Sequence, residues 1–475
     1  MTQDELGVGI GVARLHLLTT GPSRVFKCSW ELTEAFRNFF DLMSSSTLDS
    51  VCATFFSPAL DLLVDCQNVR TCVQLPDAAW IRFGIDRVLQ EILSGRAYLQ
   101  QHGYRIDHCP PLSNYFESLK SKRRLSLLSE LNERWIQKFS ATLADPLAQY
   151  SELAEFDLYA GDGHWHSAAA HDGPQGDTKR AVGHCYSLDL RRHTLRHLDL
   201  AQGKKEHDIH LLKRQEAQKL RQGAPKGRKV LYAWDKASID FHAWHRWKMV
   251  SGIYFVSLEK SNMKLLVTGL PEWDRNDPVN ASVISVEWVA GIAGVMIRRI
   301  RYRRPDTGEI LSFLTSEMTL RPGLIVFLYK LRWDLEKVFD QLKNKLGEKQ
   351  AWASTVTAKT IQAQFICLTH NLLLLVERRL LEDGITNNAE LERKAKELAS
   401  ALDFAAKAGR TIPTPVVALQ RFTQRSVKLL RWLKVQSPRS TLLARRYTST
   451  HPPLRLSLTP FLGHRSWREK VTGSK

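Results

Sequence analysis

The spacing of hydrophobic residues changes along the chain and divides it into parts. Before about residue 150, segments such as "SWELTEAFRNFFDLMSS" and "LSLLSELNERWIQKFSATL" repeat apolar residues at helical spacing. After that point come short apolar runs, "FDLYAGD" and "KVLYAWD", each typical of a buried strand and each ending in an aspartate. The pattern therefore predicts a helical N-terminal part followed by a mixed α/β core.

Further patterns extend this core. The segment "AVGHCYSLDLRRHTLRHLDLA" indicates a hairpin, "GIYFVSLEK" a strand, and "VMIRRIRYRRPDTGEILSFL" a hairpin within a β-rich insertion. Two long helices are predicted in "LYKLRWDLEKVFDQLKNKLG" and "TIQAQFICLTHNLLLLVERRLL". We therefore predict five parts in chain order. Residues 1–150 form a helical domain, and residues 151–263 and 321–384 form the two pieces of an α/β core. Residues 264–320 form a β insertion between these pieces, and residues 385–475 form a helical basic C-terminal region.

The charge of the chain points to a polyanionic partner. Its net charge is +19, and residues 391–475 hold 18 Lys and Arg against 4 Asp and Glu. An excess of this size favours nucleic acid, although a solvated basic tail would also produce it. No apolar run approaches the roughly 18 residues of a membrane span. We therefore expect no membrane association.

The cysteines and the first residues favour a reducing setting. The seven cysteines are odd in number and scattered, so neither a disulfide framework nor a zinc site is indicated. The N-terminus starts "MTQDELGVGIGVARLHLL" and lacks the basic and apolar regions of a secretory signal. We expect a cytoplasmic protein.

The helix predicted over 328–347 carries an unusual polar stripe. At about 100° per residue, Tyr329, Arg332, Glu336 and Lys343 fall within about 60° of one another. The leucine-rich side beside this stripe faces the core. Two cations, a phenol and an acid in one line suit a helix that lies along a nucleic-acid phosphate backbone and uses the carboxylate to hold a metal ion. Loose ion pairs on the flank of a helix would produce the same pattern. Periodicity alone does not exclude Asp340, which lies near the stripe.

These four residues follow the spacing Y-x(2)-R-x(3)-E-x(6)-K. This spacing resembles the signature of insertion-sequence transposases of the IS-four group, within the DDE superfamily. The blocks "LYAGDGHWH" and "VLYAWDKASIDFHAWHRWKMVSGIYFVSLEKSN" resemble that group's first and second aspartate blocks, and "FLTSEM" resembles its threonine-containing strand. The resemblance covers about residues 155–375.

The resemblance implies a ribonuclease-H-like core in which Asp162, Asp235 and Glu336 hold two magnesium ions, with manganese as a substitute. Magnesium prefers carboxylate and phosphate oxygens, and two such ions can activate a nucleophile and stabilise the leaving oxygen. Aspartates also end strands for purely structural reasons. The rivals for the two aspartate positions are Asp157, Asp172 and Asp240.

One feature departs from the group's pattern, which often has Gly-Thr or Gly-Ser after the first aspartate. Here the chain reads "DGHWH", so His164 and His166 share one strand face. They could hold a further metal, but hydrogen bonding or a substrate contact is the more ordinary role.

The resemblance also implies that Tyr329, Arg332 and Lys343 contact DNA phosphates near the cleaved end. In the β insertion, Arg299, Arg301 and Arg303 share a face that suits a DNA backbone, unless they only protect a sheet edge. By analogy with related proteins, Trp288 is a candidate for stacking on a flipped base.

The predicted function is that of a DNA transposase. It would move its insertion sequence by cut-and-paste, through two-metal hydrolysis and 3′-hydroxyl strand transfer. The expected partners are terminal inverted repeats and target DNA, bound by a homodimer at the bacterial nucleoid. A ribonuclease-H-like nuclease without strand transfer, and a non-catalytic DNA-binding protein derived from a transposase, are the alternatives.

Overall fold

A computed structural model of the chain describes residues 55–382 and a few residues between 396 and 407. Short stretches inside that range fall outside the description, namely 72–73, 91–93, 103–109, 170–171, 173–180, 203–205, 207, 292–293 and 305–306. The helix predicted in "SWELTEAFRNFFDLMSS" and nearly all of the basic C-terminal region also lie outside it. Predictions for those segments therefore stay predictions.

Helices occupy most of the described chain before residue 150. After a helical stretch at 55–63 come α3 (Asp77–Leu89), α4 (Gly95–His102), α5 (Leu112–Ser118) and α6 (Lys122–Phe139), then the short 3-10 helices η1 (Ser140–Thr142), η2 (Pro146–Gln149) and η3 (Ser151–Leu153). Ser121 begins α6, because its side chain accepts a hydrogen bond from the Arg124 backbone N–H. Trp80 of α3 packs on Phe365 of α12 (Val356–Glu382), with ring centroids 4.8 Å apart. These helices therefore share a core with the later part of the chain.

In the part of the chain that the structure describes, nine strands form one mixed sheet in the order β3-β2-β1-β4-β5-β9-β8-β7-β6. The predicted hairpins are confirmed as β2–β3 and β8–β9. Parallel pairing joins β1 to β4 and β4 to β5, and the other neighbours are antiparallel. The strands are β1 (Phe156–Ser167), β2 (Ala181–Asp189), β3 (Leu195–Leu200), β4 (Lys229–Trp234), β5 (Ile253–Leu258), β6 (Leu266–Gly269), β7 (Val283–Ala290), β8 (Met296–Arg303) and β9 (Ile310–Thr315).

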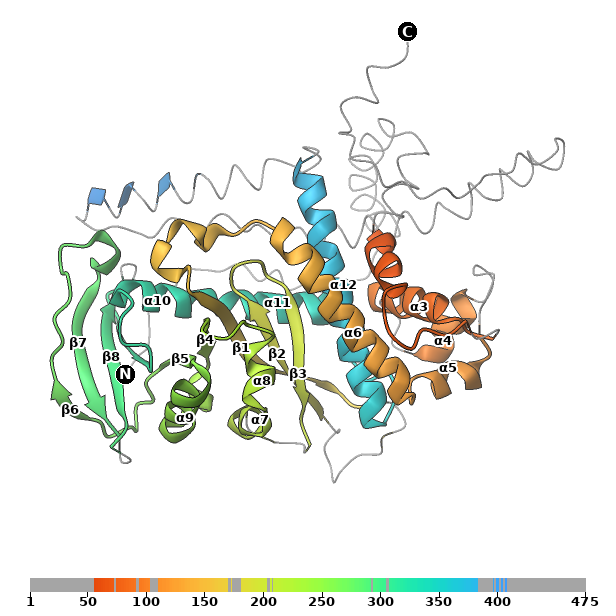
Figure 1. Ribbon diagram of the computed structural model, residues 1–475, viewed down its shortest axis with the longest axis horizontal. Coiled ribbons are helices and arrows are strands. Elements are labelled where there is room, and N and C mark those ends of the chain that lie inside the picture. The colour runs from red at the N-terminus through yellow and green to blue at the C-terminus, as the bar shows by residue number, and fades with distance from the viewer. Residues whose placement is uncertain are drawn as a thin grey trace, which may run out of the picture. The chain divides into compact units, whose positions relative to one another are not determined.

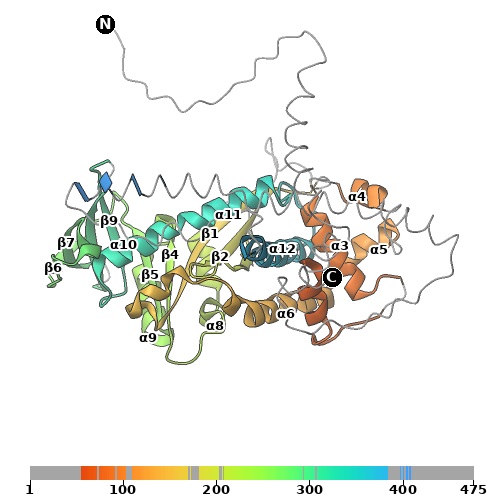
Figure 2. The same cartoon turned by 90° about the horizontal axis from the view of Figure 1, so that it is seen from above.

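Helices cover both faces of this sheet (Figure 1). One face packs against α7 (Asp208–Arg214), α8 (Ala217–Arg221) and α9 (Phe241–Ser251), through a cluster that includes Tyr159, Tyr232 and Trp244. The opposite face meets α10 (Pro322–Leu331), α11 (Trp333–Asn344) and α12, and α10 and α11 follow each other along the sheet in both views (Figure 2). Two further 3-10 helices, η4 (Lys236–Ser238) and η5 (Pro278–Asn280), complete the described elements.

The alternation along β1 and β4 decides which residues reach the second face. Tyr159 and Tyr232 belong to the cluster under α7–α9, so residues an odd number of positions away point towards α10–α12. Asp162 and Asp235 are such residues. Gly161 precedes Asp162 and lies opposite Trp234 of β4, and a Cβ atom there would come within 2.4 Å of the Trp234 ring. The glycine thus makes room for the indole on the face that α7–α9 cover.

The mixed α/β architecture is consistent with the ribonuclease-H-like transposase core that the resemblance implies. The strands of the predicted β insertion, β6 to β9, continue the same sheet beyond β5. Among the described helices, none is both long enough and apolar enough to cross a bilayer.

Candidate active site

Two aspartates lie side by side, Asp162 within β1, which continues to Ser167, and Asp235 directly after β4. The parallel pairing places Gly161 opposite Trp234, so the next residues, Asp162 and Asp235, are neighbours. Asp162 Oδ1 accepts a hydrogen bond of 2.8 Å from the Gly163 backbone N–H. Asp235 is half-buried, and its backbone carbonyl accepts a hydrogen bond of 2.9 Å from the Ser238 N–H. Among the described residues, its carboxylate forms no hydrogen bond or ion pair. Its carboxylate is therefore available to a ligand.

The single helix predicted over 328–347 is wrong, because the chain forms two helices that meet at Arg332. The backbone N–H of Arg332 donates to the Tyr329 carbonyl at 3.0 Å, and that of Leu335 donates to the Arg332 carbonyl at 3.0 Å. Both bonds span three residues, which is the tighter 3-10 spacing. The core side of α11 is as predicted, since Leu335, Val338 and Leu342 are buried.

Arg332 joins Asp162 to Glu336. Its guanidinium donates to Asp162 Oδ2 at 2.9 Å and lies 2.9 Å from Glu336 Oε1. The Arg332 side chain is only 7% exposed, whereas Glu336, one helical turn later, is 35% exposed. Two carboxylates from segments 174 residues apart are thus held by one cation.

The electrostatic environment includes Asp235 and Tyr329 as well. Burial opposes the charged form of Arg332, but Tyr329 and the nearby carboxylates, Asp235 among them, outweigh this and raise its pKa. Burial also raises the pKa of Tyr329, in part offset by Arg332. The Arg332 guanidinium carbon lies 5.5 Å from the centroid of the Tyr329 ring. The site is therefore a group of three acids around one buried cation and a neutral phenol.

The three carboxylates fit divalent metal ions in ligand type, since they offer the hard oxygens that magnesium prefers. Among the described residues they do not form a set with ligand atoms all within 4.8 Å of one another. Two ions about 4 Å apart can be held by ligands that do not all meet at one point. A bound pair would supply the charge that Arg332 supplies to Asp162 and Glu336 in this structure.

The rival acids all have other partners. Asp157 pairs with Arg228, and Asp240 begins α9 by accepting a hydrogen bond of 2.9 Å from the Ala243 N–H. The carboxylate of Asp172 lies 3.7 Å from the Lys359 ammonium, and Asp340 accepts a hydrogen bond from Asn344. None of these contacts involves Arg332.

The predicted DNA-contacting residues differ in their surroundings. Lys343 is exposed on α11, whereas Tyr329 and Arg332 are buried and contact protein groups. On β8, Arg301 and Arg303 are exposed. In contrast, Arg299 forms ion pairs with Glu287 and Glu259, and Trp288 on β7 is half-buried. The phosphate-contact and stacking roles stay predictions.

Sequence reasoning missed the contact between Arg332 and Asp162. The spacing of Arg332 and Glu336, four residues apart on a helix, was a signal for their own ion pair. Nothing in the local pattern indicated that the same guanidinium reaches β1.

Sequence reasoning also missed the buried residues His184, His197 and Glu348, which lie beside His164 and His166.

Comparison with known proteins agrees with the resemblance. Residues 160–372 match the family model described as the transposase DDE domain, a range that includes Asp162, Asp235 and Glu336. No curated protein matches the chain significantly. The family match supports a DDE transposase and transposase function in general, and this family implies DNA binding. The narrower assignment to the IS-four group stays a prediction.

Proposed function

We propose that the protein is a cut-and-paste DNA transposase of the IS-four group, with Asp162, Asp235 and Glu336 as its metal-binding catalytic residues. One observation carries the proposal. Asp162 of β1 and Asp235, which follows the parallel strand β4, lie beside the buried cation that also binds Glu336 of the signature helix. The match of this segment to the transposase DDE domain supports the same assignment.

The chain's own groups would act by position and charge. Asp162 and Asp235 project from a rigid sheet, and Glu336 projects from a helix packed on it, so the three carboxylates are preorganised. When bound, a magnesium pair would activate a water or a 3′-hydroxyl and stabilise the departing oxygen. Arg332 bridges Asp162 and Glu336 and compensates part of their charge.

DNA would lie along the exposed cations near this site. We propose Lys343 on α11 and Arg301 and Arg303 on β8 as phosphate contacts, since these three side chains are solvent-exposed. The paired Arg299, the buried Tyr329 and Arg332, and the half-buried Trp288 would contribute only if DNA binding rearranges their present contacts. The helical N-terminal part and the basic C-terminal region would bind the inverted repeats, and two copies would assemble on paired ends.

A strand-transfer assay tests the proposal. The substrate is DNA carrying the inverted repeats found beside the gene, incubated with the full chain, magnesium and a target plasmid. We expect cuts at both ends, followed by covalent joining of the freed 3′-ends to the target. Cutting without joining would indicate the nuclease alternative. Binding without either reaction would indicate a non-catalytic protein.

A further inference from the structure

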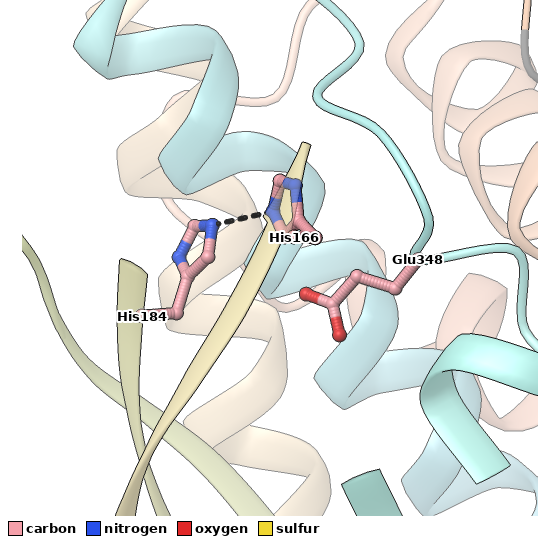
Figure 3. Close-up of side chains that lie close together, drawn as sticks. All are labelled: His166, His184 and Glu348. Atoms are coloured by element: carbon pink, nitrogen blue, oxygen red, sulfur yellow. Dashed lines mark hydrogen bonds between the residues drawn. The ribbon is translucent and has the colours of Figure 1, made fainter. Parts of the chain in front are cut away.

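A second group of potential ligands lies on the same face of the sheet, beyond Asp162. His166 of β1, His184 of β2 and Glu348, which follows α11, offer ligand atoms that all lie within 4.8 Å of one another (Figure 3). All three residues are buried. The Nε2 atoms of the two histidines are 3.0 Å apart. Two imidazole nitrogens on one tetrahedral zinc ion would be about 3.4 Å apart, so an ion requires little movement here.

The neutral forms of His166, His184 and His197 carry one proton too few for the hydrogen-bond contacts that these side chains make. His166 Nδ1 contacts the Ser167 carbonyl at 2.9 Å, and His184 Nδ1 contacts His197 Nε2 at 3.0 Å. His197 in turn hydrogen-bonds to the backbone of Asp199. The three imidazoles therefore form a row between two backbone groups, with four hydrogen-bond contacts along it. Each contact requires one proton. Each neutral imidazole carries one N–H, so three protons are available for four contacts.

A cationic His184 would supply the fourth proton, but its surroundings oppose that charge. His184 and His166 are both buried, and burial disfavours an uncompensated charge on an imidazole. A metal ion between the two Nε2 atoms would take the place of the missing proton. Neutral imidazole is also the form that binds metals.

Glu348 presents a second unsatisfied position. Its side chain is fully buried, and its Oε1 accepts a hydrogen bond of 2.6 Å from the Tyr186 hydroxyl. Its Oε2 lies 3.1 Å from His164 Nε2, yet among the residues that the structure describes neither atom has a hydrogen-bond partner of good geometry. A buried carboxylate oxygen without a donor is a position that a metal ion can fill.

We propose that His166, His184 and Glu348 bind a structural zinc ion, with His164 as the fourth ligand or as the group that orients Glu348. Two imidazoles and a carboxylate are nitrogen and oxygen ligands that zinc accepts, whereas magnesium avoids imidazole. The contacts of His166 with a carbonyl and of His184 with His197 are the outer hydrogen bonds that usually orient such ligands. Burial of all three ligands leaves no open position for a substrate, so the role is structural.

The ion would stabilise the packing of the segments that carry the candidate active site. His166 lies four residues after Asp162 on β1, and Glu348 lies twelve residues after Glu336. A bond through the ion would therefore hold the end of the α11 segment against β1 and β2. This function is separate from phosphodiester chemistry and stands without the proposed transposase activity.

Metal analysis of the purified full chain tests the site. We expect about one zinc per chain in the wild type, loss of zinc after dialysis against a strong chelator, and a melting temperature about 5–10 °C lower until zinc is restored. Cobalt added to the stripped protein should give the visible absorption of a tetrahedral site. A wild type that binds neither zinc nor cobalt would overturn the proposal.

Variants assign the ion to its ligands. Glu348→Gln and His184→Ala should retain less than about a fifth of the wild-type zinc, because each removes one ligand of a tetrahedral site. His370→Gln is the matched control, since His370 is also fully buried but contacts the His193 carbonyl instead. Glu336→Gln should keep its zinc, which separates this site from the three acids. Normal zinc in both ligand variants, or loss in Glu336→Gln alone, would place the ion elsewhere.

Discussion

Replacing Glu336 with glutamine should reduce cleavage at the element's ends by at least about a thousandfold, because a lost metal ligand removes several kcal/mol of transition-state stabilisation. Glutamine has nearly the same shape but carries no charge, and its amide is a poor magnesium ligand. Glu336 is partly exposed and forms an ion pair with Arg332 on the neighbouring turn. The fold should therefore tolerate the change. The measurement is the rate of strand cleavage on end DNA with magnesium in excess.

The control for this variant is Asp340→Asn. Asp340 lies one turn further along α11, is exposed, and bonds only to Asn344 among the described residues. Its replacement should leave cleavage within about twofold, since surface changes away from a site cost little. Equal losses in both variants would show that general damage to α11, and not the lost ligand, explains the result.

Binding of end DNA should separate from chemistry in the same experiment. Glu336→Gln should bind with unchanged or slightly higher affinity, since it removes a negative charge near the phosphates. Lys343→Ala should weaken binding and make its salt dependence shallower by about one counterion. An unchanged salt slope would remove Lys343 from the phosphate contacts.

The second large effect is expected from Arg332→Ala. Removing the guanidinium leaves Asp162 and Glu336 without their shared counter-charge. Loss of one partner of a buried pair costs about 3–5 kcal/mol, but Glu336 is a third exposed, so we expect about 2 kcal/mol in the metal-free protein. This loss corresponds to a melting temperature about 5 °C lower.

Magnesium should restore much of that stability. If the carboxylates bind metal ions, the ions replace the missing positive charge, so magnesium should stabilise Arg332→Ala more than the wild type. Thermal unfolding with chelator and with magnesium, for both proteins, gives the comparison. Arg332→Lys serves as the control, because it keeps the charge but cannot bridge both acids with a planar fork. Equal stabilisation of all three proteins by magnesium would argue against metal binding by these acids.

The strands that position the aspartates could be predicted because they are buried on both faces. "FDLYAGD" and "KVLYAWD" are continuous apolar runs, and such runs mark central parallel strands. Their final aspartates therefore become neighbours once the two runs pair in parallel, although β1 continues past Asp162 to Ser167. The hairpins were equally predictable, because turn residues separate two β-prone runs.

The contacts of Arg332 could not be predicted from its helix. Helical periodicity placed Tyr329, Arg332 and Glu336 on one stripe beside the core side, but it does not show what that stripe meets. In the structure it meets β1, because Arg332 lies in a tight turn between α10 and α11 and its side chain reaches Asp162. A local pattern contains no information about such a long-range contact.

The partners of the β8 arginines could not be predicted either, because they depend on the register between β7 and β8. Alternation correctly placed Arg299, Arg301 and Arg303 on one face, but only the pairing of β7 with β8 puts Glu287 opposite Arg299. The proposed zinc site was partly indicated by the histidines of "DGHWH". Its carboxylate, Glu348, lies 182 residues after His166. Groups assembled from distant segments require the fold.

The most direct test of the account is the position of manganese in crystals of the full chain bound to end DNA. The anomalous scattering of manganese identifies the ion without reference to activity. The account predicts manganese bound by the carboxylates of Asp162, Asp235 and Glu336. Manganese absent from these three side chains in a complex that is competent for cleavage would contradict it.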